Sequence, residues 1–284
     1  MRELKDKKLL DILRCPVCQA GMRVSDNCAS LLCCGAQKTH CYDFASSGYV
    51  SLASPDQSGG GDSKVAVRAR SDFLNTGYYL KVAQTVDELV LKHANKSLPI
   101  IDAGCGEGYY SMFPAKNGFS VYGVDLSKFA VDAAAKRAVR EGIENAFFST
   151  ASVFKIPVAD FSVGAVINIF APCVEQEFSR VLAENGVLIV AYAGENHLLG
   201  LKGAIYDNIY ANNDRADLPV NMKKIDEQRV RYTIDLESNS EIMSLFAMTP
   251  YYWRTSVSDA QKLVGIDKLS TEVDIIISVF GKTN

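Results

Sequence analysis

The stretch that decides the fold is Leu98-Pro-Ile-Ile-Asp-Ala-Gly-Cys-Gly-Glu-Gly108, a short apolar run followed by closely spaced glycines. An apolar run that stops at glycine predicts a strand at 98–104, and the glycines predict a tight turn into a helix. Glycine allows a sharp turn and close approach of the backbone to a ligand. The stretch therefore predicts a strand–turn–helix unit with a ligand at its turn.

Strands and helices alternate outward from this turn. The pattern predicts strands at 120–125, 145–150, 163–170 and 186–193, and helices at 107–117 (ended or kinked by Pro114), 126–142 and 174–182. Before the turn, a helical pattern at 66–95 is interrupted by Gly77. After the turn come extended segments at 229–235 and 271–280 and helices near 240–246 and 256–264. The alternation predicts an α/β fold with a mostly parallel, doubly wound sheet.

Composition narrows the class of protein. The 284 residues are 48% hydrophobic and 22% charged, which is typical of a globular protein. No apolar run reaches the roughly 18–20 residues of a membrane helix, and the N-terminus has no signal-peptide core, so we expect a cytoplasmic protein without membrane contact. Residues 1–84 hold 11 Lys and Arg against 8 Asp and Glu, whereas the net charge of the whole chain is -3. A polyanion surface is therefore expected in the N-terminal part.

A cysteine cluster occupies the N-terminal part, where six of the eight cysteines fall within residues 15–41. In a reducing compartment such a cluster favours a metal site over disulfides. Cys15-Pro-Val-Cys18 is a Cys-x-x-Cys knuckle, and no thioredoxin-like βαβ pattern accompanies it. The spacing predicts a zinc ribbon with a structural Zn²⁺, the alternative being cysteines without a metal.

The remaining two ligands come from Cys33, Cys34, His40 and Cys41. Adjacent cysteines point in different directions, so one of Cys33 and Cys34 is expected to bind. Cys33 is favoured because it shares one side of an extended strand with Leu31. His40 is favoured as the fourth ligand, with Cys41 as the alternative.

Acidic residues around the glycine turn distinguish between cofactors. The dinucleotide pattern Gly-x-Gly-x-x-Gly is absent, and Asp102 and Glu107 would repel a pyrophosphate. Gly104 and Gly106 with these acids suit a ligand with a cationic end, such as S-adenosylmethionine. Asp125, at the end of the next strand, is the expected acceptor for the ribose hydroxyls.

Other strand ends are expected to border the same site, because ligands bind at the carboxyl ends of parallel strands. Ser152, Val153 and Phe154 are candidates to flank an adenine, and Asn168, Phe170 and Pro172 to line the substrate pocket. Phe170 is either a stacking platform for a base or a core aromatic. From position alone, His197 is as readily a surface residue as a ligand contact.

These motifs, in their order, resemble the RlmA (RrmA) family of bacterial large-subunit ribosomal RNA guanine-N1 methyltransferases. The resemblance covers nearly the whole chain and is carried by the following segments: CPVC at 15–18, HCYDF at 40–44, GYVSL at 48–52, GYY at 77–79, DAGCGEGYY at 102–110, GVDLSK at 123–128, IFAPC at 169–173, HLLGLKG at 197–203 and MTPYYWR at 248–254.

The resemblance implies a zinc ribbon fused to a class I, Rossmann-like methyltransferase domain, in a homodimer that binds a large-subunit ribosomal RNA hairpin. We divide the chain into a ribbon at 1–52, a linker and basic helix at 53–84 and a methyltransferase domain at 85–284. The implied zinc ligands are Cys15, Cys18, Cys33 and His40. The implied cofactor contacts are Tyr79, Gly106, Glu107 and His197.

The expected activity is S-adenosylmethionine-dependent methylation of N1 of a guanine. One alternative is a small-molecule methyltransferase of the same fold, which leaves the ribbon without a role. Another is a catalytically inactive zinc-ribbon RNA-binding protein, against which the complete set of Asp102, Gly104, Gly106 and Asp125 argues.

Overall fold

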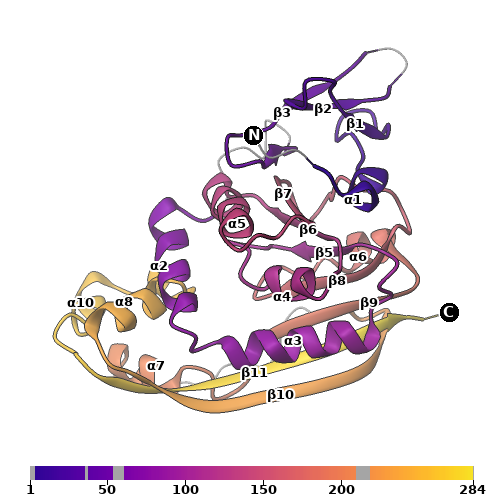
Figure 1. The fold of residues 1–284 in the computed structure, drawn as a ribbon. Helices are drawn as coiled ribbons and strands as arrows, with labels where there is room; N and C mark the ends of the chain where they lie inside the picture. Colours follow the sequence, from indigo (N-terminus) through magenta and orange to yellow (C-terminus); the bar gives the residue numbers. More distant parts are fainter. Residues whose placement is uncertain (1–3, 36–37, 54–60, 209–217, 284) are drawn as a thin grey trace.

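The centre of the molecule is an eight-stranded sheet with the order β10-β11-β9-β8-β5-β6-β7-β4 (Figure 1). The structure is a computed structural model that describes residues 4–35, 38–53, 61–208 and 218–283. The strands of this sheet are β4 (Val50–Ser51), β5 (Ile100–Ala103), β6 (Val121–Asp125), β7 (Ala146–Thr150), β8 (Val163–Ile169), β9 (Leu182–Ala193), β10 (Met222–Leu236) and β11 (Leu269–Lys282).

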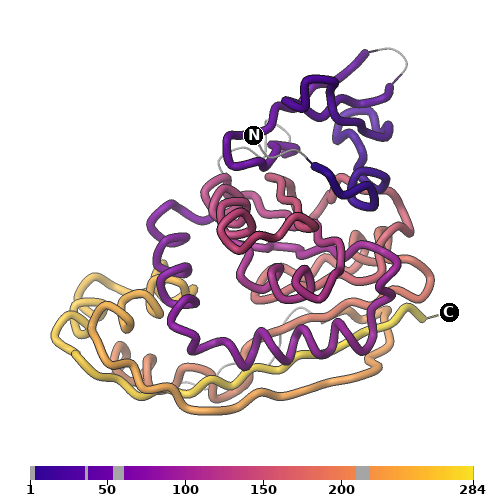
Figure 2. Tube along the Cα trace, viewed as in Figure 1, coloured from indigo at the N-terminus to yellow at the C-terminus, as the bar shows by residue number. Residues whose placement is uncertain are grey.

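The six strands from β9 to β4 run parallel, and β11 lies antiparallel to both β9 and β10. The predicted doubly wound, mostly parallel sheet is therefore confirmed. The two C-terminal strands are longer than the sequence pattern indicated and form the long paired ribbon along one side of the molecule in Figure 2. Exposed positions interrupt the buried ones along β10, so only its later part looks like a strand from hydropathy alone. β11 has a continuous buried run and extends beyond the predicted segment only by exposed or partly buried residues at its ends.

Helices cover both faces of the sheet (Figure 1). The helices are α1 (Lys7–Ile12), α2 (Lys64–Asn75), α3 (Leu80–His93), α4 (Met112–Lys116), α5 (Lys128–Arg140), α6 (Glu175–Val181), α7 (Leu199–Ile205), α8 (Asn239–Ala247), α9 (Tyr251–Arg254) and α10 (Val257–Gln261). In the part of the chain that the structure describes, none of them is long and apolar enough to cross a membrane.

Two helix predictions differ in outcome. The predicted break at Gly77 is confirmed: Gly77 has a φ of 88° and separates α2 from α3. The helix expected at 107–117 is wrong in its start, because α4 begins only at Met112. Pro114 then lies in the first turn of the helix, where a missing N–H costs no intrahelical hydrogen bond.

The N-terminal residues form a small antiparallel sheet that packs beside the large one. Its strands, in the order β1-β2-β3, are β1 (Met22–Val24), β2 (Ser30–Cys33) and β3 (Cys41–Asp43). β4 leaves this unit and joins the edge of the large sheet next to β7. Leu9, Leu13 and Leu31 share one apolar core with Ile101 and Tyr122 of the large sheet. Residues 54–60 of the predicted linker lie outside the described residues.

Candidate functional site

A cavity of about 660 Å³ opens at the carboxyl ends of β5, β6 and β8. β5 lies between β6 and β8, so the chain order reverses there, and such a switch point is where doubly wound sheets bind ligands. The volume is in the range typical of small-molecule sites. Predicted site residues that line it are Tyr79, Asp102, Gly104, Gly106, Glu107, Asp125, Val153, Phe154, Phe170, Pro172 and His197.

The glycine turn forms the floor of this cavity. Gly104 and Gly106 have φ angles of 80° and 53°, a region that side chains other than glycine rarely adopt. A Cβ atom on Gly104 would lie 2.5 Å from the Cβ atom of Ala171, in the loop after β8. The turn therefore needs glycine at position 104 for both its conformation and its close packing.

Asp125 ends β6 and holds the turn through two backbone hydrogen bonds. Gly106 N donates to its Oδ2 at 3.1 Å and Ser127 N to its Oδ1 at 2.8 Å. Burial raises the pKa of this carboxyl, and these two N–H groups oppose the shift. Each carboxylate oxygen has lone pairs left for further donors, which fits a pair of ribose hydroxyls.

Asp102 and Glu107 are both buried but are held differently. Asp102 Oδ2 accepts a hydrogen bond from Ser111 Oγ, and burial raises the pKa of Asp102 to about 7. Glu107 is 1% exposed, and its Oε2 accepts from Nε of Arg137 at 2.8 Å and from Nη2 of the same guanidinium. Glu107 thus braces the turn against α5 as well as lining the cavity.

His197 and Tyr79 form a buried pair in the cavity wall. The backbone N–H of Asp274 donates to Nδ1 of His197 at 3.3 Å, which assigns the ring hydrogen to Nε2. Nε2 lies 3.3 Å from Tyr79 Oη, so the ring donates to the phenol oxygen. Burial lowers the pKa of His197 to about 4, and the imidazole is therefore neutral near pH 7.

The loop after β8 presents Phe170 to the cavity. Phe170 has a φ of 53°, its side chain is 49% exposed, and its ring stacks on that of His197 with centroids 6.0 Å apart. Asn168 lies beneath the cavity rather than in its wall: it is fully buried and donates to the carbonyl oxygens of Ala103 and Pro172. Asn168 therefore shapes the loop that carries Phe170 and Pro172.

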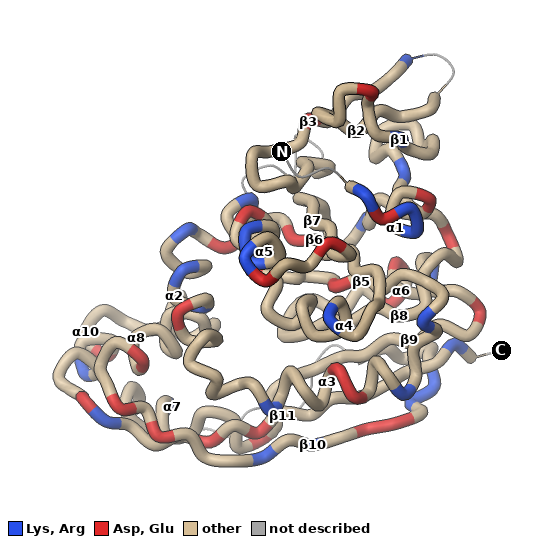
Figure 3. Tube along the Cα trace, in the orientation of Figure 1, with Lys and Arg blue, Asp and Glu red and all other residues tan. Residues whose placement is uncertain are grey.

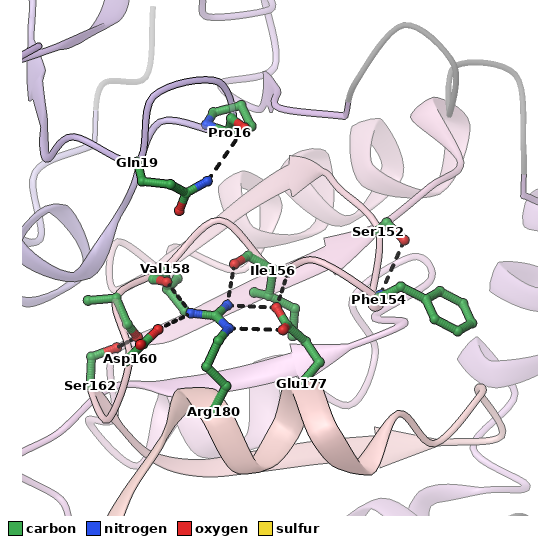
Figure 4. A network of polar contacts seen from close by, with 11 residues as sticks. Pro16, Gln19, Ser152, Phe154, Ile156, Val158, Asp160, Ser162, Glu177 and Arg180 are labelled. Atoms are coloured by element: carbon green, nitrogen blue, oxygen red, sulfur yellow. Dashed lines mark hydrogen bonds and ion pairs between the residues drawn. The ribbon is translucent and has the colours of Figure 1, made fainter.

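The wall expected to flank an adenine follows β7. Val153 and Phe154 line the cavity, whereas Ser152 is buried and its Oγ accepts from Phe154 N at 3.2 Å. Figure 4 shows how the next residues are fixed. Arg180 of α6 donates to the carbonyl oxygens of Ile156 and Val158, both at 2.9 Å, so this wall is clamped to the helix.

The sequence patterns do not predict one part of the cavity wall. Arg70 and Asp62 form an ion pair at the cavity, and their spacing around the start of α2 carries no recognisable signal. The corner between α8 and α9 contributes a further set, which the MTPYYWR motif marked without a role: Met248, Thr249, Pro250, Tyr251 and Arg254.

A second site lies in the small N-terminal sheet, where the structure brings together Cys15, Cys18, Cys33 and His40 with all ligand atoms within 4.8 Å of one another. A tetrahedral zinc with Zn–S near 2.3 Å and Zn–N near 2.05 Å requires S···S near 3.8 Å and S···N near 3.5 Å. The observed distances are 3.7 Å between Cys18 and Cys33 Sγ, and 3.5 and 3.4 Å from His40 Nδ1 to the sulfurs of Cys15 and Cys33. This donor set fits a zinc ion, and the neighbouring Cys34 and Cys41 lie outside it.

Residues 94–247 match the model of a family described as a methyltransferase domain, which is more than half of the chain. The chain belongs to this methyltransferase family. The class I, Rossmann-like methyltransferase fold predicted from the sequence is thereby confirmed.

Curated relatives match this methyltransferase over nearly its full length. The "23S rRNA (guanine(748)-N(1))-methyltransferase" of Streptomyces fradiae is 26% identical over 95% of this chain and 98% of its own. Two others are named "Putative 23S rRNA (guanine-N(1)-)-methyltransferase". They are YxjB of Bacillus subtilis (27% identical, over 94% of this chain and 97% of its own) and a protein of Micromonospora griseorubida (28%, over 95% and 96%).

Proposed function

We propose that this protein transfers the methyl group of S-adenosylmethionine to N1 of a guanine in a hairpin of large-subunit ribosomal RNA. The observation that carries the proposal is the similarity over nearly the full chain to relatives named for guanine-N1 methylation of 23S ribosomal RNA. A small-molecule methyltransferase would not account for the N-terminal unit. The intact cavity argues against an inactive RNA-binding protein.

The cavity residues fit the cofactor by their chemistry. Asp125 offers carboxylate oxygens to the ribose hydroxyls, and Val153 and Phe154 offer an apolar wall for the adenine. Asp102, Glu107, Tyr79 and His197 surround the space left for the methionine end, with Gly104 and Gly106 keeping the backbone close. S-adenosylmethionine supplies a methyl group on a sulfonium sulfur, and an attacking nitrogen takes this methyl group and displaces the sulfur.

The protein itself contributes alignment of the two reactants. Phe170 and Pro172 border the place for the guanine, where the exposed ring of Phe170 stacks on a base taken out of its helix. Well-oriented reactants gain many powers of ten in rate. Methylation of N1 forms a C–N bond and breaks the C–S bond, so that S-adenosylhomocysteine leaves with the electron pair of that bond, and the N1 proton passes to solvent water. His197 is not a free base for that proton, because its Nδ1 already accepts from Asp274 N.

The test is incubation with labelled S-adenosylmethionine and large-subunit ribosomal RNA from a strain that lacks the enzyme, followed by mass spectrometry of the nucleosides. We expect N1-methylguanosine at a single hairpin position. Cofactor binding without label in RNA would reject the proposal in favour of a small-molecule methyltransferase, and absence of cofactor binding would favour the inactive RNA-binding protein.

We further propose that Cys15, Cys18, Cys33 and His40 hold one structural Zn²⁺. The adjacent cysteines provide a matched pair of variants, since Cys33 is buried in the cluster and Cys34 is exposed beside it. Elemental analysis is expected to find one zinc per chain in the wild type and in C34S, and a loss of zinc in C33S. Equal zinc content in C33S and C34S would reject this ligand set.

The remaining expectations belong to the same proposal. They are a cytoplasmic homodimer and a division of the chain at residues 52 and 84. Sedimentation of the purified protein tests the dimer. Limited proteolysis tests the division, with cleavage expected in the polar, glycine-rich stretch at 54–63.

A further inference from the structure

Helix α9 forms part of the rim of the cavity and carries the single tryptophan of the chain. Tyr251 and Arg254 are one helical turn apart and both line the cavity. Trp253 lies between them but outside the lining, and its side chain is 66% exposed. The helix at the rim of the cavity thus also presents a large aromatic ring to solvent.

This tryptophan sits on a supported helix. The ring of Tyr252 contacts that of Trp253 at 5.0 Å between centroids and that of buried Phe246 at 5.5 Å. At the end of α9, Thr255 N donates to Tyr251 O at 2.9 Å, and the Thr255 hydroxyl contacts Tyr206 Oη at 2.5 Å. An exposed Trp on an ordered helix offers stacking area at little cost in conformational entropy, which is typical of recognition surfaces.

Positive charge accompanies the ring. Arg254 is exposed on the same helix, and Lys64 and Arg68 are exposed on α2, which packs against α8. Figure 3 shows that basic residues recur along α2. Three acidic residues of this region form ion pairs with basic side chains: Asp62 with Arg70, Asp72 with Arg68, and Asp259 with Lys262. Glu241 of α8 instead accepts hydrogen bonds from Tyr78 Oη and Glu237 N. An aromatic ring interleaved with basic side chains suits a single-stranded nucleic acid segment, whose bases stack while its phosphates pair with cations.

We propose that Trp253 stacks on the base of a nucleotide next to the target guanine and that Arg254 contacts the adjoining phosphate. The inference rests on the proposed function and adds a second contact to the RNA. Phe170 lies inside the cavity with the target base, whereas Trp253 lies outside the lining and reaches only a flanking nucleotide. An RNA loop held at two bases is fixed in both position and direction.

The single tryptophan makes the contact directly measurable. Tryptophan emission, excited so that the 13 tyrosines contribute little, is followed while unmodified large-subunit ribosomal RNA is added to the protein with S-adenosylhomocysteine. We expect RNA to quench the tryptophan emission. The quenching should saturate at the same RNA concentration as binding measured separately with labelled RNA. Base–aromatic stacking supports a loss of RNA affinity of roughly 5- to 150-fold in W253A. W253F is expected to retain most of the affinity and R254A to lose affinity with a smaller salt dependence.

Phe161 provides the matched control. It is an equally exposed aromatic residue, 65% exposed, but precedes β8 at the opposite end of the strand from the cavity. F161A is expected to leave RNA affinity unchanged. W253A and F161A are both expected to bind S-adenosylhomocysteine like the wild type.

The outcomes separate this inference from the proposed function. RNA methylation with unchanged tryptophan emission, or with full RNA affinity in W253A, would overturn the stacking contact alone. Quenching by RNA without methylation would keep the contact and reject the activity. A change in sedimentation of W253A without a change in RNA affinity would instead assign Trp253 to an interface between copies of the chain and overturn the inference.

Discussion

The ion pair between Glu107 and Arg137 ties the glycine turn to α5, and its removal is the sharpest test of how the cavity is held. The two side chains are 1% and 6% exposed, so both charges are removed from water. Arg137→Met leaves the Glu107 carboxylate buried without its cation. Removing one partner of a buried pair costs about 3–5 kcal/mol, because the remaining charge is uncompensated.

This loss translates into a large thermal shift. At roughly 2–4 °C per kcal/mol for a protein of this size class, R137M is expected to melt about 6–20 °C below the wild type. The doubly apolar variant E107M/R137M removes both charges and is expected to recover most of the loss. It will not recover the contact between the Arg137 guanidinium and the Tyr109 ring, 5.5 Å apart. R140M, on the exposed face of the same helix, is the control and is expected to change stability by less than about 0.5 kcal/mol.

The pH dependence gives an independent check. Burial raises the pKa of Glu107 and Arg137 opposes that shift, so R137M raises the folded-state pKa further. A group with a raised folded-state pKa contributes stability at low pH that is lost as the pH rises through that pKa. The loss of stability of R137M relative to the wild type should therefore be smaller at pH 5 than at pH 8 in thermal melts followed by circular dichroism. A deficit below about 1 kcal/mol at pH 8, or a double variant no more stable than R137M, would refute the reasoning.

Three further predictions concern the cavity. D102N is expected to remove a pH dependence of stability, because burial raises the pKa of Asp102 to about 7. The wild type should therefore lose stability relative to D102N as the pH rises from 4 to 7. The same change of melting temperature with pH in both proteins would contradict this. The ring protons of His197 should titrate in NMR spectra near pH 4, because burial lowers the pKa of this side chain; a midpoint near 6.5 would show that the ring is solvated. G104A is expected to weaken S-adenosylhomocysteine binding at least about tenfold through its clash with Ala171, whereas G142A, with open space around it, should bind normally in calorimetry.

Local patterns in the sequence were sufficient for the parts of the site that depend on one segment. The glycine turn and Asp125 follow from a strand, a turn and the next strand end, whose relative placement is a property of every doubly wound sheet. The preference for Cys33 over Cys34 follows from alternation along a strand, and only Cys33 of the two joins the four-residue cluster.

Contacts between distant segments were not accessible in the same way. Glu107 was expected to face a cationic ligand, but its principal partner is Arg137, thirty residues away on the buried face of α5. An arginine on a helix with several charged residues has no pattern that distinguishes a buried position from a solvated one. The wall built by α8 and α9 depends likewise on how the C-terminal part folds back over the sheet.

The N-terminal sheet is joined to the large one by contacts that link the proposed zinc site to the cavity wall. Leu52 N donates to Thr150 O at 2.8 Å, and Arg14 N donates to Pro157 O at 2.9 Å. These two contacts hold both ends of residues 150–157, the segment that carries Val153 and Phe154 into the cavity wall. Arg14 directly precedes Cys15, a member of the cluster. A metal that fixes Cys15 therefore also fixes the wall proposed for the adenine, so its removal should weaken cofactor binding as well as RNA binding. If the N-terminal unit served only to contact RNA, removal of the metal would weaken RNA binding and leave cofactor binding unchanged.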